Sequence, residues 1–151
     1  MDFASLIHKN IVKVPLEGQD KDEVLAELVE IQVRAGAVKD RDGVLEALSD
    51  REAKGSTAIG NGVAIPHAKH RDVQGVAVGV GVSREGVSFD ARDGRLVHLF
   101  FLVLAGCQDP SLSISVLAGI ANLVQVPGLC EQMVSARDVA ALIEVFQKVL
   151  V

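Results

Sequence analysis

The chain has 151 residues, of which 49% are hydrophobic, and its formal net charge at pH 7 is −5. This length fits one domain with a substantial core, and the high apolar fraction excludes a disordered chain. Only 3% of residues are aromatic, Trp and Tyr are absent, and there is no basic stripe. The composition therefore argues against binding of DNA, RNA or single-stranded nucleic acid, and the acidic balance favours a basic protein surface as partner.

The cysteines and the apolar segments predict the compartment. Cys107 and Cys130 stand alone, without a CxxC motif, as expected for reduced thiols in a cytosolic protein. The N-terminus does not read as a signal peptide. The longest apolar stretch, residues 96–105, is interrupted by His98 and is shorter than the about 20 residues that a membrane-spanning helix needs. We expect a cytoplasmic protein without direct membrane insertion.

Hydrophobic periodicity and turn signals predict helices and strands in alternation along the chain. The expected helices span residues 2–8, 20–36, 40–54, 109–127 and 135–150, with a short helical turn over 129–133. The expected strands span residues 11–14, 56–59, 63–65, 73–82, 86–89 and 96–104. Because helices precede, interrupt and follow the strands, we predict a single α/β (α+β) domain over residues 1–151 with a mixed sheet.

Two helix starts carry capping signals, and one strand carries a burial signal. Asp20 with Glu23, and Ser135 with Asp138, resemble capping boxes, in which side chains bind the free N–H groups of the first turn. The run over residues 96–104 is continuously apolar, which is typical of a strand buried on both faces.

The stretch Arg51–Lys69 (R-E-A-K-G-S-T-A-I-G-N-G-V-A-I-P-H-A-K) is the most informative part of the chain. Pro66 restricts the backbone just before His67, which follows an expected strand. Neutral imidazole is a nucleophile at cytosolic pH, and Nε2 is free to attack if a backbone carbonyl binds the Nδ1 proton. The Arg51 guanidinium and the amides of the glycine-rich turn suit a phosphoryl group. Three residues are candidates for lining the same site, or alternatively only shape the turn: Ser56, Thr57 and Asn61.

A metal site is the alternative interpretation of the histidines. His67 and His70 form a His-x-x-His pair, but catalytic zinc normally has a third protein ligand. His98 is a conceivable third ligand, although it falls inside an expected strand. Gly79-x-Gly81 lacks the third glycine and the following helix of a dinucleotide-binding motif. We therefore predict neither a metal nor an organic cofactor.

The eighteen residues R-E-A-K-G-S-T-A-I-G-N-G-V-A-I-P-H-A resemble the signature of the fructose/mannitol-type IIA components of the bacterial phosphoenolpyruvate:sugar phosphotransferase system. That family includes the nitrogen-regulatory IIA proteins. The L-V-H-L-F-F-L-V strand and the L-A-G-I-A-N-L helix follow in the family's order, so the resemblance covers nearly the whole chain. It implies an α/β sandwich, with helices flanking a mixed central sheet, and a phosphoryl carrier that uses His67 as acceptor and Arg51 to stabilise charge.

The resemblance also implies the partners. His67 would take the phosphoryl group from the carrier protein HPr, or from its nitrogen-branch relative, and pass it to a IIB domain. The alternative is a regulatory binding module of the nitrogen-regulatory kind, with weakened or lost relay activity, that binds a regulatory protein target.

The sequence departs from the family in one important place, with a smaller departure at Ala58, where glycine is common. Ser113 stands where members usually carry a second active-site histidine. A serine hydroxyl can bind a phosphoryl oxygen but carries no positive charge. We therefore expect the phosphohistidine to be less stabilised or to transfer more slowly, with His70 as a candidate for partial replacement.

Overall fold

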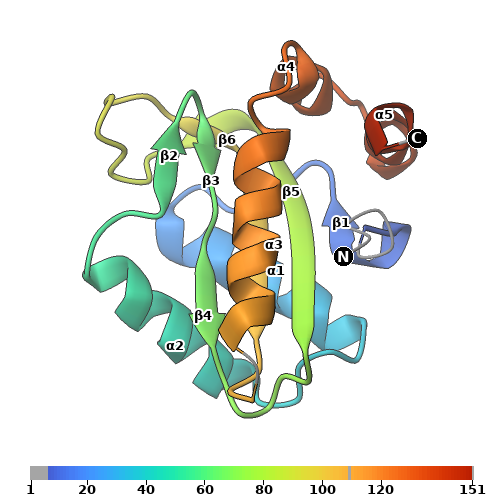
Figure 1. Ribbon diagram of the computed structural model, residues 1–151. Coiled ribbons are helices and arrows are strands. Elements are labelled where there is room, and N and C mark those ends of the chain that lie inside the picture. The colour runs from blue at the N-terminus through green and yellow to red at the C-terminus, as the bar shows by residue number, and fades with distance from the viewer. Residues whose placement is uncertain (1–6, 109, 151) are drawn as a thin grey trace.

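A mixed sheet with helices on both faces forms the body of the molecule (Figure 1). The computed structural model describes residues 7–108 and 110–150. The described helices are the 3₁₀ helix η2 (Lys9–Ile11), α1 (Lys21–Arg34), α2 (Arg41–Ala53), α3 (Pro110–Leu123), α4 (Leu129–Val134) and α5 (Val139–Leu150). The described strands are β1 (Val12–Lys13), β2 (Ala58–Gly60), β3 (Val63–Ala64), β4 (His67–Lys69), β5 (Val76–Val87) and β6 (Val97–Ala105). The predicted fold class is confirmed.

Strand β6 is the centre of the sheet, whose order is β1-β5-β6-β3-β2, with β4 also paired to β6. β5 and β6 are antiparallel, whereas β3 and β4 both run parallel to β6. Val63 of β3 pairs with Leu99, and His67 of β4 pairs with Val103. β3 and β4 therefore follow one another along the same side of β6, with Pro66 between them.

The side chains of β6 alternate between two cores. Phe101 belongs to the core under α3, α4 and α5 and meets Phe146 edge to face, with ring centroids 6.3 Å apart. Phe100 belongs to the core under α1 and α2 and meets Phe89, with centroids 5.3 Å apart. Successive residues of a strand point to opposite faces. The prediction of a strand buried on both faces is thus confirmed.

Side-chain caps fix the starts of α1 and α2. The Asp20 carboxylate accepts a hydrogen bond from the Glu23 N–H at 2.8 Å, and the Glu23 carboxylate accepts one from the Gln19 N–H at 3.2 Å. This confirms the expected cap at Asp20. At α2 the Asp40 carboxylate accepts from the Gly43 N–H at 3.0 Å. Both caps satisfy N–H groups that have no partner inside the helix.

Two expected helix starts differ or lie outside the described residues. Ser135 ends α4, and α5 begins after Asp138, whose carboxylate accepts from the Ala141 N–H at 2.8 Å. The expected cap at Ser135 is therefore wrong, because Asp138 supplies the capping oxygen. Most of the expected helix over residues 2–8 and the expected start at Asp109 fall outside the described residues.

The expected strands over residues 73–82 and 86–89 differ from the single strand β5. Gly75 has φ +67°, so the chain turns there and β5 begins only at Val76. Gly86, with φ +84°, lies within β5, whose register against β6 shifts between Val82 and Val87. The irregular stretch between Val82 and Val87 lies inside one strand, so the two expected strands are parts of β5.

None of the helices in the described residues is long and apolar enough to cross a membrane. Cys107 and Cys130 are free thiols.

Candidate active site

His67 lies in a pocket of about 550 Å³ between α2, β4, β6 and α3, elements that lie side by side in Figure 1. The wall from β6 and most of the wall from α3 are apolar. The polar lining consists of Asp50, Arg51, Lys54, His67, Lys69 and Ser113. The fold thus brings three of the expected site residues together: Arg51, His67 and Ser113.

The backbone at His67 is held by the sheet. Pro66 has no N–H, but its carbonyl accepts a hydrogen bond from the Val103 N–H at 3.0 Å. His67 then opens β4 instead of only following a strand, because the chain resumes its pairing with β6 immediately after the proline. The imidazole is half-buried. The backbone that carries the His67 ring is thus held in place by the sheet, while part of the ring stays accessible.

Its Nδ1 lies 2.8 Å from the backbone oxygen of Ile65. A carbonyl oxygen only accepts hydrogen bonds, so Nδ1 is the protonated nitrogen. Nε2 of the neutral ring then carries a free electron pair. This matches the arrangement expected from the sequence for a nucleophilic histidine.

Arg51 lies on the last turn of α2 and is half-buried. Its Nη1 donates a hydrogen bond to the Gly55 carbonyl at 2.8 Å, which holds the side chain across the end of the helix. One such bond leaves other guanidinium N–H groups available for an anion.

The two lysines of the pocket were not expected from the sequence. Lys54 lies one helical turn beyond Arg51, and Lys69 lies two residues beyond His67 on the same side of β4. Those spacings are the signal that points to them. Among the described lining residues, Arg51 and the two lysines thus place three cationic side chains beside one carboxylate, that of Asp50. The pocket is therefore locally positive in a chain whose net charge is −5.

Ser113 lies in the second turn of α3 and is 7% exposed. Its hydroxyl donates a hydrogen bond to the Pro110 carbonyl at 3.0 Å. The hydroxyl proton is thus already bound. Ser113 therefore offers the pocket only its uncharged hydroxyl oxygen.

Ser56 and Thr57 do not line this pocket. The Ser56 hydroxyl donates to the Phe89 carbonyl, and the Thr57 hydroxyl donates to the buried carboxylate of Glu52. Both side chains fasten the loop between α2 and β2. Their contacts fit the structural alternative for these residues.

His70 also lies outside the pocket lining. Its Nδ1 accepts a hydrogen bond from the Asp72 N–H at 3.0 Å, and its Nε2 lies 3.4 Å from the Asp40 carboxylate. The Asp72 carboxylate in turn accepts from the backbone N–H groups of Asp40 and Lys39, which lowers its pKa. These contacts tie His70 to the start of α2, so they do not favour its replacing a second active-site histidine.

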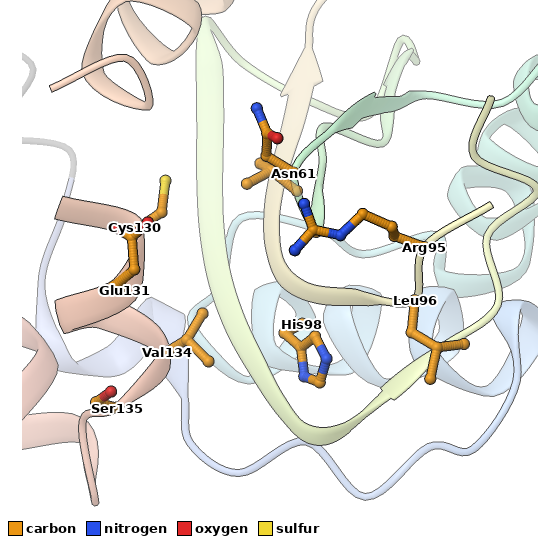
Figure 2. Close-up of a pocket in the computed structure, with 10 residues that line it drawn as sticks. Asn61, Arg95, Leu96, His98, Cys130, Glu131, Val134 and Ser135 are labelled. Atoms are coloured by element: carbon orange, nitrogen blue, oxygen red, sulfur yellow. The ribbon is translucent and has the colours of Figure 1, made fainter. Parts of the chain in front are cut away.

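Asn61 lines a different pocket, at the other end of β6 (Figure 2). Arg95 and His98 line it from the sheet side, and Cys130 and Glu131 of α4 face them. The Nδ1 of His98 lies 2.9 Å from the Ser83 carbonyl. Across residues 7–108 and 110–150, no three His, Cys, Asp or Glu side chains are grouped to hold a metal.

Several known proteins are similar to this chain in sequence and in fold. The chain is 31% identical over 148 residues to the fructose-specific EIIABC component of Bacillus subtilis, covering 98% of this chain and 23% of that protein. The nitrogen regulatory protein IIA-Ntr of Neisseria meningitidis superposes with a TM-score of 0.85 at 26% identity, over 94% of this chain and 97% of that one. Enzyme IIAMtl of Escherichia coli, solved in complex with phosphorylated enzyme IIBMtl, superposes with a TM-score of 0.79 at 20% identity, over 94% and 97% of the two chains.

The family model described as "Phosphoenolpyruvate-dependent sugar phosphotransferase system, EIIA 2" matches residues 5–149. The chain spans less than a quarter of the Bacillus subtilis relative but nearly all of the two solved structures. The match, the fold and the histidine pocket agree: the chain belongs to the EIIA 2 family of phosphoryl carriers of the phosphoenolpyruvate-dependent sugar phosphotransferase system.

Proposed function

We propose that His67 is the residue that carries the phosphoryl group. The proposal rests on two features that occur together at the His67 ring: its hydrogen-bonded Nδ1 and the positive charge of its pocket. Nδ1 is bound to the Ile65 carbonyl, which leaves Nε2 as the nucleophile. In front of it, the described lining of the pocket holds Arg51 and two lysines beside one carboxylate. A nucleophile beside an excess of positive charge suits an incoming dianionic group.

The transfer is a displacement at phosphorus. The electron pair of His67 Nε2 attacks the phosphorus of a donor phosphohistidine, and the donor's P–N bond breaks with its electron pair returning to the donor ring. The Nδ1 proton of His67 stays on the nitrogen that faces Ile65. Arg51 lies in the same pocket, where its free N–H groups reach toward the charge on the phosphoryl oxygens.

The donor in this proposal is an HPr-like phosphocarrier, or its nitrogen-branch relative, and the acceptor is a IIB domain. The Escherichia coli relative solved with phosphorylated IIBMtl supports the choice of acceptor. The reaction takes place in the cytoplasm, the compartment expected from the two free cysteines.

Labelling tests the assignment of His67. The chain is incubated with phosphoenolpyruvate, enzyme I and either HPr or its nitrogen-branch relative, and acid-labile, base-stable phosphate is measured. We expect one phosphoryl group per chain, none in His67→Ala, and onward transfer to a IIB domain. His8→Asn is the matched control, because His8 is exposed and far along the chain from the pocket.

Label that persists in His67→Ala would contradict the assignment. A folded wild-type chain that accepts no label from either donor would favour the regulatory binding module instead.

A further inference from the structure

The described residues of α3 bring no charged donor to the pocket. Among the described residues of α3 that line the pocket, only Ser113 is polar, and its hydroxyl donates a hydrogen bond to the Pro110 carbonyl. A serine hydroxyl has no positive charge at any working pH. Charge for a phosphoryl group on His67 must therefore come from α2 or from β4.

His70 does not supply it. Its Nδ1 accepts a hydrogen bond from the Asp72 N–H, and its Nε2 lies beside the carboxylate of Asp40 at the start of α2. The ring is absent from the pocket lining. The remaining candidates beside Arg51 are the lysines of the pocket. In the part of the chain that the structure describes, neither Lys54 nor Lys69 forms an ion pair or a hydrogen bond through its ammonium.

Lys69 is the better placed of the two. It is paired with Ala105 of β6, just as His67 is paired with Val103, so the sheet fixes both backbones. Residues two apart on a strand point to the same face, with their Cα atoms roughly 7 Å apart. The four-carbon stem of Lys69 is long enough for its ammonium to reach a group on the His67 ring.

Lys54 is less favourable. It is the C-cap residue of α2, and the negative end of the helix dipole there attracts a cation. The adjacent Gly55 has φ +150°, so the chain leaves the helix immediately after Lys54. Its backbone is not held by the ladder that carries His67.

We propose that the Lys69 ammonium binds the oxygens of the phosphoryl group on His67 and supplies the positive charge that Ser113 cannot. This inference rests on the proposed function of His67. No proton moves through Lys69 in this step. It acts by contact with the phosphoryl group, which makes it a catalytic residue of the transfer.

The test uses a donor without a protein surface, so that docking plays no part. The chain is phosphorylated with phosphoramidate, the reagent is removed, and the decay of phosphate on His67 is followed at neutral pH. We expect the phosphohistidine of Lys69→Gln to decay about fivefold to twentyfold faster than that of the wild type. Lys69→Arg keeps the charge and is expected to stay within about twofold of the wild type.

Two comparison variants sharpen the result. Lys54→Gln is expected to change the decay less than Lys69→Gln does. Lys148→Gln, on the exposed side of α5, is the control for loss of any lysine and is expected to match the wild type. The difference between Lys69→Gln and the wild type should also shrink as ionic strength rises, because an exposed charge is screened.

Equal decay of Lys69→Gln and the wild type would overturn the inference, as would an effect of Lys54→Gln as large as that of Lys69→Gln. A defect seen only with a protein donor would assign Lys69 to docking and would overturn it as well. Failure of the folded wild type to take phosphate on His67 from any donor would contradict the proposed function itself. That outcome differs from the others because it is visible before any lysine is changed.

Discussion

At the scale of single residues, Ser113 is the polar side chain that α3 contributes to the described lining of the His67 pocket. It is buried in the His67 pocket, and its hydroxyl donates a hydrogen bond to the Pro110 carbonyl. In Ser113→His, an imidazole with a reference pKa of about 6.5 would add a charge that is present at low pH and lost as the pH rises. We expect its phosphohistidine on His67 to last severalfold longer than that of the wild type near pH 6, with no difference above about pH 8.

The measurement is the decay of labelled protein between pH 6 and pH 8. Ser113→Asn is the matched control, because it is polar and does not titrate. A change in Ser113→His that is the same at every pH would show that size, and not charge, is responsible.

At the scale of elements, Glu27 joins α1 to the edge of the sheet. Its carboxylate accepts from the Glu17 N–H at 2.8 Å and the Gly18 N–H at 2.8 Å, and it pairs with Lys13 of β1 at 2.6 Å. Burial raises the pKa of Glu27, but the hydrogen bonds from Lys13 and the two backbone N–H groups outweigh burial and lower it.

A lowered folded-state pKa means that the carboxylate contributes its stability fully above its unfolded value of about 4.5. That contribution is lost as the pH falls through the folded value. Glu27→Gln should therefore reduce the free energy of unfolding by about 1 to 3 kcal/mol at pH 7, and the deficit should shrink below about pH 4.5. Urea unfolding at several pH values measures it.

Glu46→Gln serves as the control, since Glu46 is exposed on α2 and should leave the stability within about 0.5 kcal/mol. A deficit in Glu27→Gln that stays constant down to acid pH would show that the charge of Glu27 is not involved.

At the scale of the whole molecule, one strand serves two cores. Phe101 and Phe100 are fully buried neighbours in β6 that face opposite sides of the sheet. Phe101→Ala and Phe100→Ala should each cost about 3 to 5 kcal/mol of unfolding free energy, through lost burial and the cavity left behind. Because both cores are built on β6, each variant should still unfold in a single transition seen alike by circular dichroism and by calorimetry.

Ile59→Ala is the control, because Ile59 is 50% exposed and its truncation should cost little. Two separate transitions in either phenylalanine variant would mean that the two faces of the sheet fold independently.

The sequence by itself determined the class of the elements and pointed to the stretch that supplies most of the described polar lining of the His67 pocket. Capping at Asp20, the apolar run of β6 and the Arg51–Lys69 motif are local patterns, and local chemistry decides them. The start of α5 and the merging of two expected strands into β5 were not predicted, because a competing cap at Asp138 and pairing with β6 decided them.

Only the tertiary structure decided which residues surround His67. Ser56, Thr57 and Asn61 are close to it in sequence, yet they face Phe89, Glu52 and a separate pocket. Ser113 arrives from a distant helix. The register of β4 on β6 and the packing of α2 and α3 beside it are long-range pairings, and these place side chains in space irrespective of their distance along the chain.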